Sequence, residues 1–157
     1  MRRWVNTQDF NLAPEAHHWY TQYANGSPGR FARAVSSDLF SWHNQIDPML
    51  SRAMRGDHPA GLGTLMSPLI DGWASDWVKQ GDKLGENRSK EAANHKAADM
   101  MLALVAQRAH MGLTDPSRSQ ASLRTIDSIT RATESLRTNV SFKMVMEHLV
   151  AGISDKG

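Results

Sequence analysis

The chain has 157 residues, a formal net charge of +2 and no cysteine. This length suits one substantial domain or two small ones, and the composition excludes disulfides and thiolate metal sites and favours an intracellular location. The weak charge bias does not by itself indicate nucleic-acid binding. No stretch approaches the about 18 continuous apolar residues of a membrane span, and the N-terminus lacks the apolar core of a signal peptide. We therefore expect a cytoplasmic protein that does not enter a membrane.

Residues that start or stop helices divide the first third of the chain. A helix is predicted over 14–24, where Asn25-Gly26 ends it, and a short one over 28–35. A longer helix is predicted from about Ser36 to residue 53, because apolar residues recur there at helical spacing. Pro48 is expected to kink or break that helix.

Helical patterns also fill the remainder of the chain. No segment shows the alternation of a strand, so we predict an all-α helical bundle of about seven helices. The polar stretch 81–89 contains two glycines and is expected to be mobile, whereas residues 56–59 form a turn. The further helices are predicted over 62–78, from the N-cap Ser89 to Gly112, from Pro116 to Leu136, and from Ser141 to about Ile153.

In the helix after Pro116, side-chain character predicts which face is buried. One side carries apolar residues and threonines and is expected to face the core, and the opposite side carries charges and is expected to face solvent. The expected core side consists of Leu123, Ile126, Ile129, Thr130, Thr133 and Leu136, and the expected solvent side of Arg124, Asp127, Arg131 and Glu134.

The last helix has two distinct faces when its residues are rotated by about 100° each. A core-facing stripe gathers Phe142, Val145, Met146, Leu149 and Ile153, with Val150 at its edge. Met144 and Ala151 lie on the opposite side with His148 beside them. An apolar residue on such a back face is commonly incidental, because much of any protein surface is apolar. The alternative is that this face contacts another protein.

The sequence contains no pattern typical of a catalytic or metal site. Its seven histidines form no ligand pair of known spacing, and only His17 and His18 are close in sequence, where adjacent helical residues point about 100° apart. There is no phosphate-binding loop and no nucleophile elbow. We therefore predict no catalytic residues, no metal and no cofactor, and a protein that is not an enzyme.

The stretch Gly26-Ser27-Pro28-Gly29-Arg30 is the most informative part of the chain. A glycine ends one helix, a serine is placed to cap the next, and a proline occupies its first position. Backbone N–H groups and an arginine at a helix N-terminus are also the ingredients of an anion or phosphate site. The alternative is an ordinary corner between two helices with a solvated Arg30.

Tyr20 to Ala34 resembles the end of the lid domain of bacterial clamp-loader delta-prime subunits, in which a helix leads into Gly-Ser-Pro-Gly-Arg. Leu123 to Ile153 resembles the family's closing pair of collar helices, with Asn139 in the turn between them. The resemblance implies a lid remnant of an AAA+ protein over 1–36 and a helical oligomerisation domain over 37–157. It also implies other clamp-loader subunits of DNA polymerase III as partners, with at most a weak DNA contact.

The departures from this family make the implied role non-catalytic. The family's nucleotide-binding domain has no counterpart here, which implies a fragment or truncated form. In ATP-hydrolysing relatives the arginine of the turn stands where this chain has Gly29, so Arg30 lies one residue later and is rotated by about 100°. The five residues Gly26 to Arg30 are therefore expected to be a vestigial nucleotide-sensing turn, and Met144, His148 and Ala151 a subunit interface. The alternative is a stand-alone helical adaptor or regulator unrelated to replication.

Overall fold

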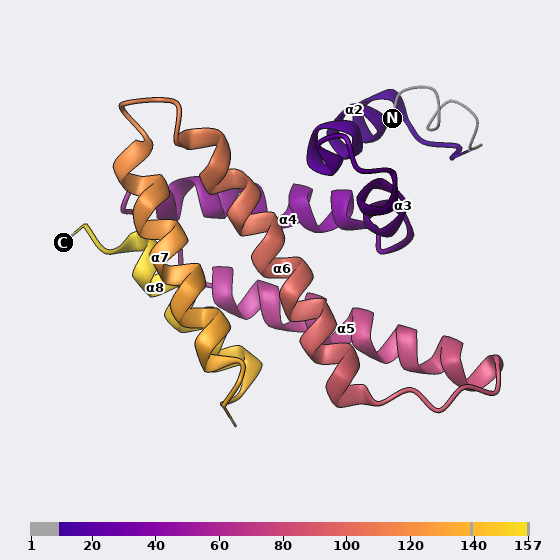
Figure 1. The fold of residues 1–157 in the computed structure, drawn as a ribbon. Coiled ribbons are helices and arrows are strands. Elements are labelled where there is room, and N and C mark those ends of the chain that lie inside the picture. Colours follow the sequence, from indigo (N-terminus) through magenta and orange to yellow (C-terminus); the bar gives the residue numbers. More distant parts are fainter. Residues whose placement is uncertain (1–9, 139, 157) are drawn as a thin grey trace. The chain divides into compact units, whose positions relative to one another are not determined.

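The computed structural model describes residues 10–138 and 140–156 and is entirely helical there, with no strand (Figure 1). This confirms the predicted all-α fold. None of the helices in these residues is both long and apolar enough to cross a membrane. The helices are α2 (Pro14–Ala24), α3 (Pro28–Ser36), α4 (Leu39–Met54), α5 (Leu62–Lys83), α6 (Lys90–Gly112), α7 (Ser119–Ser135) and α8 (Phe142–Ser154).

The chain forms two compact units that divide within α4, between Gln45 and Ile46. Pro48 lies inside α4, yet the helix continues to Met54 instead of breaking there. The assignment of 1–36 to a lid and 37–157 to a collar stays a prediction. Asn139 lies outside the described residues.

The first unit has an aromatic core. In it α2 packs against α3, and Tyr20 and Phe31 are almost completely buried with their rings 5.9 Å apart. Trp19 stacks on Tyr23 at 5.1 Å and on His43 at 5.0 Å. The Tyr20 hydroxyl accepts a hydrogen bond of 3.3 Å from the backbone N–H of Phe40 at the start of α4, and burial raises the pKa of this phenol. One backbone N–H group in the first turn of α4 is thereby paired with a side chain from α2.

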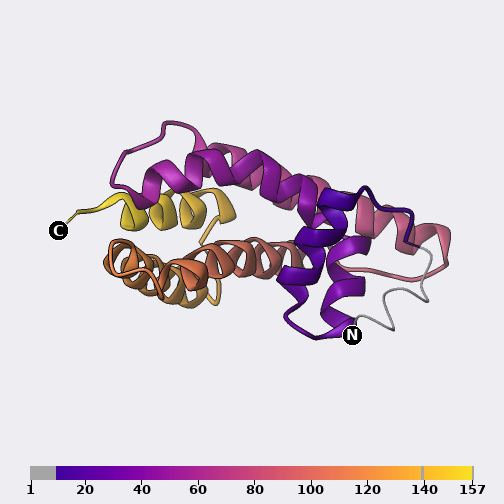
Figure 2. The same ribbon diagram turned by 90° about the horizontal axis from the view of Figure 1, so that it is seen from above.

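The second unit is a helical bundle in which four helices pack in a closed circuit. α6 packs against α5 and α7, and α8 packs against the same two helices (Figures 1 and 2). The α6 and α8 N-termini are capped as the sequence predicts: the Ser89 hydroxyl accepts from the Ala92 N–H at 3.2 Å, and the Ser141 hydroxyl from the Met144 N–H at 3.3 Å. These two caps fix where both helices begin.

The orientation predicted for α7 is wrong. Its buried face is made of small residues, and two of the apolar residues expected in the core, Leu123 and Ile126, are 60% and 37% exposed. The predicted core residue Leu136, just after the helix, is buried as expected, while the charged residue Arg124 is half-buried. The residues of α7 that face the bundle are Ser122, Thr125, Ser128 and Ala132.

Close helix packing explains this reversal. A Cβ atom added at Gly152 of α8 would lie 2.6 Å from the Ser128 Oγ, and one added at Gly112 of α6 would collide with the Ser122 hydroxyl. Side chains as large as leucine do not fit where backbones approach this closely. The buried hydroxyls of Thr125 and Ser128 donate to carbonyl groups four residues earlier, at 2.8 and 2.9 Å, so their burial leaves no unpaired donor.

The segment 81–89, expected to be mobile, begins inside α5, because this helix continues to Lys83, beyond its predicted end at residue 78. The rest of the segment is held by one arginine. Arg88 places its guanidinium 4.4 Å from the centre of the Trp77 ring and donates to the Trp77 carbonyl at 3.0 Å. The same side chain covers Gly81, where any side chain would collide with it. These contacts fasten the connection between α5 and α6 to the end of α5.

Candidate functional site

The turn between α2 and α3 has the local structure that its sequence predicts. Asn25 and Gly26 adopt left-handed backbone conformations, with φ of 43° and 84°, and the Ser27 N–H donates to the Ala24 carbonyl at 2.9 Å. The Ser27 hydroxyl accepts from the Arg30 N–H at 3.2 Å, and Pro28 occupies the first turn of α3. Gly26 to Arg30 therefore form a capped corner between two helices.

The Arg30 side chain is directed back onto α2. Its guanidinium carbon lies 4.5 Å from the centre of the Tyr23 ring, the distance of a cation–π contact. Tyr23 is buried and stacks on Trp19, so the arginine covers the edge of the aromatic core. The arginine is neither freely solvated nor extended away from the turn.

The two glycines of this turn should respond oppositely to substitution. Gly26 has a left-handed φ of 84°, so Gly26→Ala is expected to cost about 1 kcal/mol of stability. Gly29 lies in the first turn of α3 with no atom within 4 Å of an added Cβ, so Gly29→Ala is expected to be neutral or to stabilise by about 0.5 kcal/mol. Thermal melting of both variants in one buffer measures the difference; a Gly29→Ala variant that melts below Gly26→Ala contradicts it.

The three predicted interface residues, Met144, His148 and Ala151, all lie exposed on α8, and Met144 is 49% exposed. We call them the α8 back face. The opposite side of the helix is buried, including Val145, Met146, Leu149 and Ile153, as the rotation of its residues predicts. Ala151 also lines a hollow of about 340 Å³ with residues 58–64 and Val150.

A second candidate site is a cavity of about 650 Å³ in the second unit. It lies between the end of α4, the end of α6 and the start of α7, with Lys156, the second residue after α8, at its edge. Five cationic side chains line it and no carboxylate does; we call it the basic cavity. Its cations are Arg55, Arg108, Arg118, Arg124 and Lys156.

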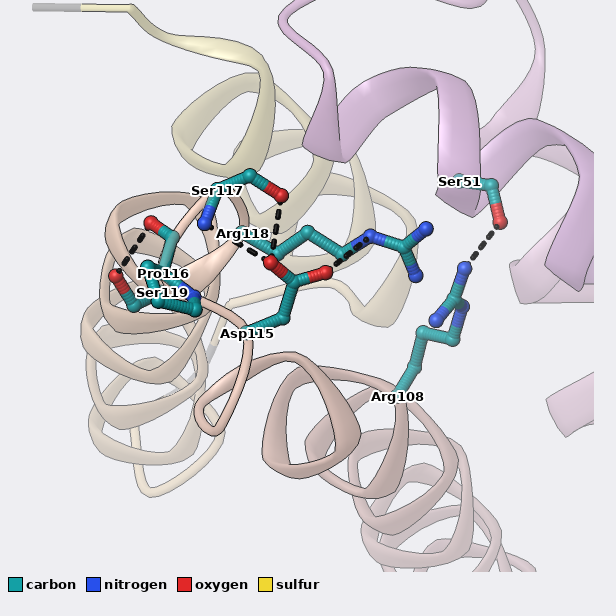
Figure 3. Close-up of polar contacts among 7 residues, drawn as sticks. All are labelled: Ser51, Arg108, Asp115, Pro116, Ser117, Arg118 and Ser119. Atoms are coloured by element: carbon teal, nitrogen blue, oxygen red, sulfur yellow. Dashed lines mark hydrogen bonds and ion pairs between the residues drawn. The ribbon is translucent and has the colours of Figure 1, made fainter.

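Two of the cations have carboxylate partners outside the lining. Arg118 forms an ion pair with Asp115 at 3.2 Å, and Ser117 donates two hydrogen bonds to that carboxylate, which lower its pKa (Figure 3). The Nε of Arg108 lies 3.1 Å from Asp47, as an ion pair without hydrogen-bond geometry, and its Nη2 donates to the Ser51 hydroxyl at 3.1 Å. Figure 3 shows both guanidinium groups extending toward the same space.

Sequence reasoning missed this cavity. Its cations stand far apart in the chain, at positions 55, 108, 118, 124 and 156, so no basic run marks them. Asp115 to Ser119 form the turn before α7, in which the Asp115 carboxylate accepts from the Ser117 N–H and hydroxyl, but no described side chain caps α7 itself. Among the residues that the structure describes, no three histidine, aspartate or glutamate side chains gather as a metal site.

The comparisons with known proteins identify no relative. No family model, no curated protein and no solved structure matches this chain.

Proposed function

We propose that this chain is a non-catalytic assembly module of a bacterial DNA-replication clamp loader, similar to the lid and collar of a delta-prime subunit. In this role it contributes contacts to other clamp-loader subunits in the cytoplasm and needs no nucleotide. The observation that carries the proposal is the two-sided character of α8. One side is buried in the bundle, while the α8 back face presents Met144 to solvent.

Two further features support this role. The corner at Gly26 to Arg30 is capped as its own sequence predicts, and its arginine contacts the Tyr23 ring instead of reaching outward to a phosphate. The hollow beside Ala151 has mainly apolar walls, including Pro59 and Val150, with Glu147 at its edge, and adjoins the α8 back face. A partly concave surface with an apolar centre and a polar edge suits contact with a partner subunit.

A stand-alone helical adaptor is the second candidate, and the outer face of α7 favours it. Leu123 and Ile126 lie three residues apart and are both exposed, which is the spacing of an apolar anchor for a partner helix. This face does not depend on the resemblance to clamp loaders. The two candidates differ in the partner that the chain binds and in the helix that binds it.

Co-expression with the DNA polymerase III clamp-loader subunits of the same genome tests the proposal. We expect the chain to co-purify with them, and Met144→Asp to weaken the association by about tenfold, since a charge would be buried in the contact. Leu84→Asp is the matched control, because Leu84 is 69% exposed and lies outside α8. Failure of the unsubstituted chain to co-purify, or retention of full association by Met144→Asp, contradicts the proposal. Loss of association on Leu123→Asp alone favours the adaptor.

A further inference from the structure

The basic cavity has more positive charge than its surroundings neutralise. Arg108 and Arg118 pair with Asp47 and Asp115, whereas Arg55, Arg124 and Lys156 pair with none of the described carboxylates. Like charges that converge on one hollow repel one another, less strongly in water than in a partly desolvated site. A bound anion would remove this repulsion.

Arg124 gives the clearest sign that a ligand belongs in the cavity. This side chain is half-buried on α7, and its Nε is buried without a hydrogen-bond partner. A buried donor on a charged group costs free energy unless an acceptor is supplied. Arg124 also lines the cavity, so a small shift of its guanidinium would bring this donor to an anion bound there.

The backbone conformation at Gly56 allows Lys156 and Arg55 to lie at the same cavity. Gly56 has a left-handed φ of 83°, and a side chain at this position would collide with the stem of Lys156. The glycine thus allows the segment after α8 to lie against the end of α4, where Arg55 also stands. This arrangement brings cations from both ends of the second unit to one hollow.

We propose that the basic cavity binds a small anion bearing a diphosphate group. Guanidinium groups bind phosphate oxygens through paired N–H donors, and three cations without carboxylate partners exceed the charge of about −2 of a single phosphate. The volume of about 650 Å³ lies within the usual range for small-molecule sites. Met54 and Ala121 provide an apolar wall for an organic group attached to the phosphates. This inference does not depend on the proposed assembly role.

Calorimetric titration of the full chain with sodium pyrophosphate tests this site. We expect saturable binding of one pyrophosphate per chain, with orthophosphate and sulfate at least about tenfold weaker because they carry less charge. Binding to the folded chain alone also raises the melting temperature with pyrophosphate concentration. The absence of saturable binding up to millimolar concentrations, or equal binding of sulfate, overturns the proposal.

Matched arginine variants locate the binding. Arg124→Gln is expected to weaken pyrophosphate binding by about tenfold, because it removes a half-buried guanidinium that has no carboxylate partner among the described residues. Arg131→Gln removes the same charge from the same helix, but Arg131 is exposed, pairs with Asp127 and does not line the cavity, so binding should persist. If both variants weaken binding equally, binding depends on the net charge of the chain and not on the basic cavity, and the proposed site is wrong.

A second variant and a second ligand test the site further. Arg55→Gln changes an exposed side chain and is expected to weaken binding by about threefold, so it tests the site even if Arg124→Gln fails to fold. A 5′-phosphorylated single-stranded oligonucleotide is titrated beside pyrophosphate. Tighter binding of the oligonucleotide, lost on Arg124→Gln, would assign the cavity to nucleic acid and overturn the small-molecule ligand.

Discussion

Leu149→Asp is expected to unfold the second unit, whereas Met144→Asp, five residues earlier on the same helix, is expected to leave its melting temperature nearly unchanged. Leu149 is 1% exposed in the core of the bundle. Aspartate there loses the buried leucine and places a carboxylate among apolar side chains, at a cost of about 4 kcal/mol or more. A cost of this size is a large fraction of the about 5–15 kcal/mol that stabilises a typical domain.

Met144→Asp should change stability by no more than about 0.5 kcal/mol. Met144 is 49% exposed and its N–H is capped by Ser141, so it lies in the first turn of α8, where a negative charge interacts favourably with the helix dipole. Thermal melting followed by circular dichroism at 222 nm compares the two variants. If Met144→Asp melts the protein as Leu149→Asp does, the two faces of α8 have been assigned incorrectly.

Ser128→Leu is expected to destabilise the bundle by about 3 kcal/mol, although it replaces a polar residue with an apolar one. The Ser128 hydroxyl lies 2.6 Å from where a Cβ on Gly152 would be, so a leucine at position 128 would press on α8 and force the two helices apart. Ser128→Ala keeps the small volume and removes only a hydrogen bond within α7, so its effect should stay below about 1 kcal/mol.

Leu123→Asp tests the exposed side of α7, opposite the buried position of Ser128. Leu123 is 60% exposed, so a charge at this position should change stability by less than about 0.5 kcal/mol. Urea unfolding of the three α7 variants measures the free energies of unfolding. A larger loss for Leu123→Asp than for Ser128→Leu would mean that α7 presents its apolar side to the bundle after all.

Most of the secondary structure was predictable because its signals are local. Ser27, Ser89 and Ser141 cap the helices whose starts they were expected to mark, and Asn25-Gly26 ends α2. Each of these signals depends on hydrogen bonds or backbone conformations within about four residues. The faces of α8 were also predictable, since its apolar stripe is continuous and Val145, Met146, Leu149 and Ile153 are buried as expected.

The orientation of α7 and the basic cavity were not predictable in this way. Which side of α7 is buried depends on Gly112 and Gly152, which lie on other helices and allow only small side chains between them. The cavity depends on five cations separated by up to 101 positions, from 55 to 156, that only the packed bundle brings together.

The sequence by itself determined where the helices with a serine cap or a glycine stop begin or end, because these signals are encoded by neighbouring residues. The end of α5 and the start of α7, which have no such signal, differ from the prediction by several residues. The sequence also determined that α8 has one buried side. Only the tertiary structure decided that α7 buries two serines and Thr125 and exposes Leu123, because the distance between packed backbones is set jointly by residues on three helices. The tertiary structure also brings Arg55, Arg124 and Lys156 to one cavity. Residues this far apart in the chain form no local sequence pattern that would reveal it.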